Sequence, residues 1–256
     1  MSIEACAALV ARGDPDRFAA VMAAPVAARE RLLPLYAFNL EVARAPWVTQ
    51  EPMIAEMRLQ WWRDTVEMIG QGATPRAHEV AGPLAQLVSE AGLPLDVMDR
   101  LIEARRWDIY RDPFADQAAF DDYLEDTGAG LMWLAAKATG APAQAESVAR
   151  DAGWAAGLAG FLRAVPELEA RGRIPLSDRS DLAISALAGR GLMRLQRARA
   201  NRVAGMSPYA FLAGWQTGRL LRQAQQRPEL VIEGGLGMSD FARKGGLLWA
   251  QLTGSW

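Results

Sequence analysis

Two pairs of aspartates stand four residues apart, the spacing that brings two carboxylates to one face of a helix. Asp108 and Asp112 enclose the run DIYRD, and Asp122 and Asp126 enclose DYLED. Such pairs can bind Mg²⁺, which neutralises a phosphate leaving group. Helix ends also explain both pairs, because a proline follows the first and Asp121 and Asp122 are expected to begin a helix. We favour these structural roles and keep a metal site as the alternative.

Five arginines have the chemistry to hold a phosphate-bearing ligand. A guanidinium group is planar and can donate two hydrogen bonds to phosphate oxygens. The candidate diphosphate-binding or ligand-binding residues are Arg58, Arg63, Arg163, Arg171 and Arg173. Ion pairing with acids on the same predicted helices explains these arginines equally well, and both interpretations stay open. Those acids are Glu56, Asp64, Glu167 and Glu169.

Aromatic residues form another group of candidates. Tyr36 and Phe38 stand in LYAFN, Trp61 and Trp62 stand in LQWWRD, and Trp47 lies between the two runs. Large aromatic side chains usually fill a helical core. A deep apolar pocket lined by the same side chains would look identical in sequence. Tyr36, Phe38, Trp61 and Trp62 are therefore candidate pocket-lining residues as well as core residues.

The composition excludes several classes of chemistry. The 256 residues include one cysteine, Cys6, and one histidine, His78. These are too few for a disulfide framework, a multi-cysteine or histidine-rich metal site, or a Ser-His-Asp triad. The net charge of −2 gives no general reason to expect nucleic-acid binding. The acidic N-terminal run does not resemble a signal peptide, so a cytoplasmic protein is expected.

Helical periodicity extends over almost the whole chain. Apolar residues from Glu51 to Ile69 follow the 3.6-residue spacing of a buried helix. Asp14-Pro15 and Ser207-Pro208 are typical helix starts. Breaks at Gly and Pro divide the chain into about nine or ten helices with no credible strand pair. The sequence therefore predicts an all-α fold, organised as a single domain over residues 1–256.

The last segment, residues 239–256, is predicted to be an amphipathic helix. Phe241, Leu248, Trp249 and Leu252 occur beside Arg243 and Lys244. Such a helix can lie on a membrane surface or a partner protein. The alternative, which we favour, is a final helix that packs on the protein's own core. No segment approaches the roughly 20 apolar residues that a membrane span needs.

The motifs YAF at residues 36–38 and LQWWRD at residues 59–64 resemble the opening of the squalene/phytoene synthase family. This resemblance covers about residues 14–225 and implies an isoprenoid-synthase fold around a central pocket. It also implies two aspartate-rich motifs that hold Mg²⁺ against a prenyl diphosphate. At the positions of the first motif this chain has Ala43, Arg44 and Trp47. The metal-binding acids of that motif are therefore replaced.

The second family motif has changed in the same way. Leu162-Arg163 and the run Arg171 to Arg173 match the family pattern. Ala164 occupies the position of the first aspartate, and the second falls at or next to Leu168. Pro166 is expected to interrupt this helix, which would leave the surviving pair Glu167 and Glu169 as a poor substitute. Loss of the acids from both motifs predicts loss of the catalytic chemistry.

One non-catalytic branch of the family resembles this chain more closely than the synthases do. It contains the mitochondrial assembly factor for respiratory complex I. Its motifs match Ala37-Phe38-Asn39, Met57-Arg58 and the run Leu162-Arg163-Ala164 with Pro166. The matches at Asn39 and Ala164 distinguish this branch from the synthases, because a synthase has different residues at those positions. The assembly role follows from this resemblance and not from composition or spacing.

These observations lead to three functional hypotheses. The first is a non-catalytic interaction or assembly factor, with respiratory-complex subunits as partners, located in the cytoplasm or at the inner face of a membrane. The second is an active prenyltransferase with a rearranged Mg²⁺ site. The third is a protein that binds a prenyl or lipid diphosphate without turning it over. No cofactor is expected, and Mg²⁺ would be needed only if catalysis persists.

Overall fold

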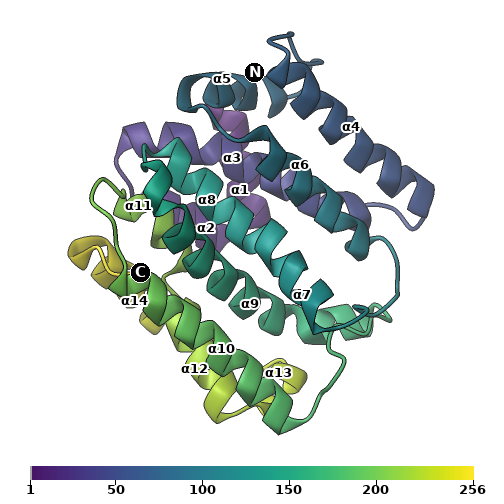
Figure 1. Ribbon diagram of the computed structural model, residues 1–256, viewed down its shortest axis with the longest axis vertical. Coiled ribbons are helices and arrows are strands. Elements are labelled where there is room, and N and C mark those ends of the chain that lie inside the picture. Colours follow the sequence, from purple (N-terminus) through teal and green to yellow (C-terminus); the bar gives the residue numbers. More distant parts are fainter. Residues whose placement is uncertain (1) are drawn as a thin grey trace.

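Helices make up the regular structure of this protein (Figure 1). The computed structural model describes residues 2–256, and within that range there is no strand. Nine α-helices have ten or more residues, and shorter helical turns lie between them. The predicted all-α class is confirmed, and residues 230–233 belong to the short helix α13 (Glu229–Glu233).

The helices divide the chain as follows. The α-helices are α1 (Ile3–Gly13), α2 (Pro15–Met22), α3 (Val26–Arg44), α4 (Pro52–Gly70), α5 (Ala81–Ala91), α6 (Leu95–Ala104), α7 (Gln117–Leu124), α8 (Gly130–Ala138), α9 (Glu146–Ala170), α10 (Asp181–Ala200), α11 (Pro208–Phe211), α12 (Thr217–Gln226), α13 and α14 (Asp240–Thr253). The shorter turns are η1 (Ala45–Trp47), η2 (Arg105–Asp108), the π-helical turn η3 (Glu125–Ala129), η4 (Ala143–Ala145) and η5 (Leu212–Gly214).

The 25-residue helix α9 is the centre of the packing. Neighbouring helices contact one another in the order α4, α6, α8, α9, α10 and α12, and α3 packs on α1 and α8 (Figure 1). Trp154 on α9 is fully buried. Burial of such large apolar side chains supplies most of the driving force for folding.

Local signals explain where several helices begin. The Asp14 side chain accepts a hydrogen bond from the Arg17 backbone N–H at 2.9 Å, and Pro15 opens α2. Asp116 caps α7 in the same way at 2.8 Å. The predicted start of α7 at Asp121 is therefore wrong, because the capping aspartate lies earlier in the chain. The predicted start at Ser207-Pro208 is correct, although α11 gives way to η5 after four residues.

Pro166 does not interrupt α9, contrary to the sequence-based prediction. The helix runs through it from Glu146 to Ala170. A proline inside a helix removes one hydrogen bond and costs about 3 kcal/mol. Contacts of α9 with α8, α10, α12 and α13 support the helix on several sides. This tertiary packing outweighs the local cost, so Glu167 and Glu169 belong to the same helix as Arg163.

Three glycines let η3 and α9 approach backbone to backbone. A Cβ atom built on Gly153 would lie 2.5 Å from the Gly128 carbonyl oxygen, and one on Gly157 would lie 3.1 Å from the Gly128 Cα. At these positions the absence of a side chain permits the close packing of η3 on α9. Gly160 differs, because its Cβ would meet no atom of residues 2–256 within 4 Å. It faces the cavity described below.

The last helix, α14, packs by one face and leaves another exposed. Ala250 is buried against Ala20 and Leu212, and the Gln251 side chain donates to the Ala23 carbonyl oxygen at 2.8 Å. On the opposite face, Phe241 is 89% exposed and Leu252 is 75% exposed. The predicted amphipathic helix is present and docks on its own protein. No helix within residues 2–256 is long and apolar enough to cross a membrane.

Candidate functional site

A cavity of about 580 Å³ lies between α3, α8, α9 and α12. Its size is typical of small-molecule sites, which occupy about 300–1,000 Å³. One group of lining residues is apolar or small: Leu124, Gly128, Leu131, Met132, Gly157, Gly160, Phe161, Leu168 and Leu220. Polar and charged side chains line the remainder: Asp14, Asp16, Arg17, Tyr36, Asn39, Arg105, Asp108, Tyr123, Arg163, Glu167, Arg171 and Gln216.

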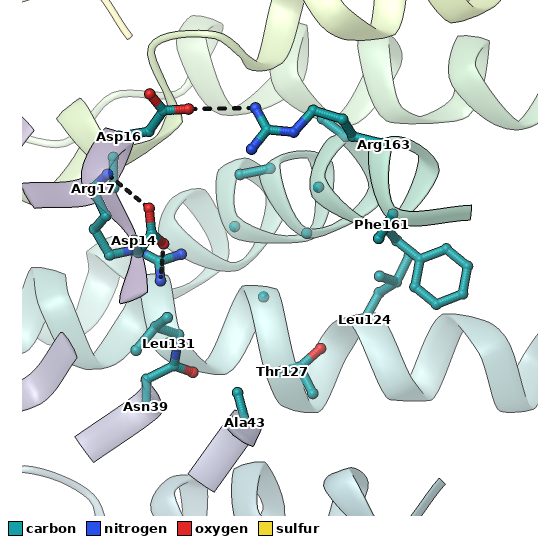
Figure 2. A pocket seen from close by; sticks show the side chains of 18 of the residues that line it. Asp14, Asp16, Arg17, Asn39, Ala43, Leu124, Thr127, Leu131, Phe161 and Arg163 are labelled. Carbon is teal, nitrogen blue, oxygen red and sulfur yellow. Dashed lines mark hydrogen bonds and ion pairs between the residues drawn. The ribbon is translucent and has the colours of Figure 1, made fainter. Parts of the chain in front are cut away.

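Four of the five positions that replace the family acids line this cavity, and the fifth, Arg44, pairs with Glu41 instead. Ala43 and Trp47 contribute from α3 and η1, and Ala164 and Leu168 contribute from α9. Figure 2 shows Ala43 next to Asn39 on the α3 wall of the cavity. Mg²⁺ requires oxygen ligands, and these four side chains have none. Within residues 2–256, no group of three or more His, Cys, Asp or Glu side chains could hold a metal ion. The residues present therefore do not fit a Mg²⁺–diphosphate cluster.

Two of the five predicted arginines line the cavity, and both form ion pairs. Arg163 contacts Asp16 of α2 at 3.4 Å, an interaction drawn across the cavity in Figure 2. Arg171 contacts Glu167 at 2.5 Å and lies over the Trp47 ring at 4.8 Å. Each guanidinium charge thus already faces a carboxylate. Ion pairing with an acid on the same helix, as predicted, describes Arg171, whereas the partner of Arg163 is Asp16 of α2, which was not among the predicted acids.

The other three arginines lie outside the cavity lining. Arg173 is 8% exposed and donates to the backbone carbonyl oxygens of Trp107, at 3.0 Å, and Asp108. Arg63 joins α4 to α6 through Asp99 at 2.7 Å, and Arg58 is exposed on α4. Burial lowers the pKa of Arg173. Arg63 and Arg173 therefore connect elements of the fold.

Within residues 2–256 the four candidate metal-binding aspartates do not form a site with a third acidic, histidine or cysteine side chain, although burial and the nearby Asp122 carboxylate both raise the pKa of Asp126. Asp108 ends η2, whereas Asp112 is exposed in the following loop, so helical geometry does not align them. Asp122 is exposed on α7, and Asp126 contacts Arg100 at 3.4 Å. Of the four, Asp108 alone lines the cavity.

Asp108 belongs to a buried polar cluster at one end of the cavity. Its carboxylate contacts Arg105 at 3.2 Å and accepts a hydrogen bond from the Tyr123 hydroxyl at 3.2 Å. Arg105 also donates to the Tyr123 oxygen at 2.7 Å. The Asp108 and Arg105 side chains are 5% and 18% exposed. Burial raises the pKa of Asp108, although the adjacent Arg105 acts in the opposite direction.

One of the four predicted aromatic residues lines the cavity. Tyr36 does so from α3. Phe38 lies two residues later, about 200° around the helix, and contacts Trp62 at 5.3 Å. Trp61 stacks edge-on against Trp62 at 4.8 Å. The prediction that Phe38, Trp61 and Trp62 line the pocket is therefore wrong, because these side chains pack with one another away from it.

Sequence reasoning missed a polar junction centred on Asp16. Its carboxylate accepts hydrogen bonds from Gln216 at 2.8 Å and from Arg243 of α14 at 3.2 Å, besides contacting Arg163. Asp14-Pro15 identified the helix start but gave no sign of these distant partners. Asn39 was also not proposed as a site residue, although the sequence comparison singled it out. It is 5% exposed and lines the cavity.

Comparison with solved structures defines the fold class. A dehydrosqualene synthase in complex with a ligand matches with a TM-score of 0.79, covering 98% of this chain and 95% of that chain at 12% identity. The squalene synthase HpnC from Alicyclobacillus acidocaldarius matches with a TM-score of 0.63 at 18% identity, covering 98% and 94%. The protein therefore has the helical fold of squalene-type synthases, as the resemblance implied.

The sequence match identifies the family. Residues 10–213 match the sequence model of the family described as squalene/phytoene synthase. The chain belongs to the squalene/phytoene synthase family, which confirms the resemblance found in its motifs.

Named relatives point to one branch of that family. A NADH dehydrogenase (ubiquinone) complex I, assembly factor 6 homolog from Drosophila melanogaster is 29% identical over 170 residues, which cover 63% of this chain and 50% of that protein. The Homo sapiens assembly factor 6 is 26% identical over 162 residues, covering 63% and 48%. The matched part thus spans about half the length of these relatives. The predicted likeness to the assembly-factor branch is confirmed.

Proposed function

We propose that this chain is a non-catalytic member of its family that acts as an interaction or assembly factor, with subunits of a respiratory NADH dehydrogenase as its partners. The observation that carries the proposal is the replacement of both acid motifs on two walls of one cavity. Ala43 and Trp47 face Ala164 and Leu168 where metal ligands would be needed. The relatives named as complex I assembly factors support the choice of partner.

The charge balance of the cavity also argues against diphosphate chemistry. Its lining includes four arginines, Arg17, Arg105, Arg163 and Arg171, and four acids, Asp14, Asp16, Asp108 and Glu167. A diphosphate leaving group carries several negative charges that Mg²⁺ or unpaired cations must neutralise. The arginines are already balanced by carboxylates. Ionisation of a prenyl diphosphate would therefore receive little electrostatic stabilisation here.

We predict that the purified protein releases no diphosphate from farnesyl or geranylgeranyl diphosphate above the uncatalysed background. The assay compares Mg²⁺, Mn²⁺ and EDTA, with circular dichroism to establish that the protein is folded. A dehydrosqualene synthase assayed in parallel serves as the positive control. Metal-dependent release that disappears in Asp108→Asn or Asp122→Asn would contradict the proposal and assign a rearranged metal site to that pair.

The assembly role predicts a physical association. The chain, tagged and expressed at its natural level, should co-purify with subunits of a respiratory NADH dehydrogenase, and its deletion should lower the amount of assembled enzyme. The exposed apolar face of α14, which includes Phe241, Trp249 and Leu252, supports placing this activity at the inner face of a membrane. An unchanged level of assembled enzyme in the deletion strain would argue against the assembly role.

A further inference from the structure

One buried polar group in the cavity has no partner within the fold. Asn39 on α3 is 5% exposed, and no residue from 2 to 256 forms a hydrogen bond with its Oδ1 atom. Figure 2 shows its amide pointing into the cavity beside Leu131. A buried carbonyl oxygen without a partner destabilises a folded protein, whereas a leucine of similar size would not. Stability alone therefore does not explain an amide at this position.

Tyr36 supplies a second hydrogen-bonding group close to Asn39. The two residues are three positions apart on α3, so they share a helix face, and both line the cavity. Burial raises the pKa of Tyr36 to about 12. Its hydroxyl is therefore protonated at neutral pH and can donate a hydrogen bond. Together, the phenol and the amide can satisfy an oxygen that both accepts and donates.

The charges around this pair favour an uncharged ligand head. Arg17 lies 5.0 Å from the centre of the Tyr36 ring, but its guanidinium is paired with Asp14 at 2.9 Å. A phosphate placed here would have to compete with the Asp14 carboxylate and be desolvated beside it. A hydroxyl or carbonyl group would not. Beyond the pair, the wall continues through Leu131, Met132 and the glycine-lined face of α9.

We infer that the cavity binds an uncharged long-chain lipid, whose hydroxyl or carbonyl oxygen hydrogen-bonds to Asn39 and Tyr36 and whose tail lies along α8 and α9. Binding requires no metal ion and no diphosphate. This site goes beyond the proposed assembly function and does not depend on it, because it rests on the cavity alone. A lipid held in this way would fill the cavity and couple α3 to α8 and α9.

The test compares ligands that differ only in the head group. The Kd of each ligand is measured in the presence of EDTA by quenching of tryptophan fluorescence. Trp47 in the cavity wall contributes to this signal. Farnesol and farnesal provide the hydroxyl and carbonyl heads, farnesene provides the same chain without one, and farnesyl diphosphate provides a charged head. We expect farnesol or farnesal to bind at least tenfold more tightly than farnesene and than farnesyl diphosphate. Added Mg²⁺ should not change the order.

Asn39→Leu separates the head-group contact from the tail contact. This variant should bind the preferred oxygenated ligand about tenfold more weakly and bind farnesene with unchanged affinity. Asn201→Leu is the matched control, because Asn201 lies at the exposed end of α10. A melting temperature of Asn39→Leu at or above that of the wild type would show that the lost affinity is not due to unfolding.

Three results would overturn the inference. The first is equal binding of farnesol, farnesal and farnesene by the wild-type protein. The second is a ratio of the Kd of the oxygenated ligand to the Kd of farnesene that is the same in Asn39→Leu as in the wild type. The third is tighter binding of farnesyl diphosphate with Mg²⁺ than of either uncharged ligand, which would restore the diphosphate-binding hypothesis.

Discussion

Replacing Asp108 with alanine is expected to lower the free energy of unfolding by about 3–5 kcal/mol, the usual cost of removing one partner from a buried ion pair. The loss has a specific origin. Arg105 would keep its charge at 18% exposure, and the hydroxyl of Tyr123 would lose its acceptor. Urea denaturation followed by circular dichroism measures the change. The same variant also tests whether Asp108 is structural or a metal ligand.

Asp112→Ala is the matched control for that experiment. Asp112 is exposed in the loop after η2, and its removal should change the free energy of unfolding by less than about 0.5 kcal/mol. If Asp108 has a structural role, the two variants should differ in their free energy of unfolding by the same amount in Mg²⁺ and in EDTA. Stabilisation of the wild type by Mg²⁺ that is lost in both variants would instead show that the pair binds the metal.

The pKa of Asp108 gives the expected pH dependence. Burial raises this pKa in the folded state above that in the unfolded chain. Between the two values the folded protein holds a proton that the unfolded chain has released, so stability falls as pH rises. The unfolding free energy of the wild type relative to Asp108→Asn should therefore decline as pH increases above about 4. A difference that grows with pH would contradict this assignment.

Gly153→Ala is expected to be the most damaging of the conservative changes, lowering the free energy of unfolding by about 3 kcal/mol. The added Cβ would lie 2.5 Å from the Gly128 carbonyl oxygen and 2.7 Å from the Ala129 Cα. Both are backbone atoms, so no side-chain rotation can relieve the contact. The π-helical turn η3 and α9 would have to separate, which also changes the cavity wall. Thermal and urea unfolding measure the effect.

Gly160→Ala, seven residues later on α9, provides the control. Its Cβ would meet no atom of residues 2–256 within 4 Å. Alanine is favoured over glycine inside a helix by about 0.5–1 kcal/mol, so this change should stabilise the protein slightly. If the two substitutions change the free energy of unfolding in opposite directions, the close contact with η3 is the cause of the stability lost in Gly153→Ala. Equal effects would exclude that explanation.

Properties that depend on local sequence were predicted successfully. The all-α class follows from helical periodicity, and the start of α2 follows from Asp14-Pro15. The replacement of family acids by Ala43 and Ala164 was also visible, because a motif has a fixed order along the chain. Pro166 was misjudged for a complementary reason. The local cost of a proline was known, but the packing around α9 that outweighs it was not.

The arrangement of the site depended on contacts between distant segments. Asp16 meets Arg163 and Arg243, which lie 147 and 227 residues further along the chain. No local pattern distinguishes these arginines from Arg58, which forms no ion pair with residues 2–256. Likewise, Tyr36 and Phe38 belong to the same motif, yet the helix turns one toward the cavity and the other toward Trp62. Residue type identified these candidates, but it could not predict which of them line the cavity.

The sequence by itself therefore determined the helical class, the family and the absence of carboxylates at both motif positions. Each of these depends on residues that are close together in the chain or that follow one another in a fixed order. Only the tertiary structure decided which charges are paired, that Asp108 is buried, and that Asn39 lines a cavity without a partner in the described chain. The physical reason is that burial and ion pairing depend on which helices pack together, and that packing is set by the whole chain.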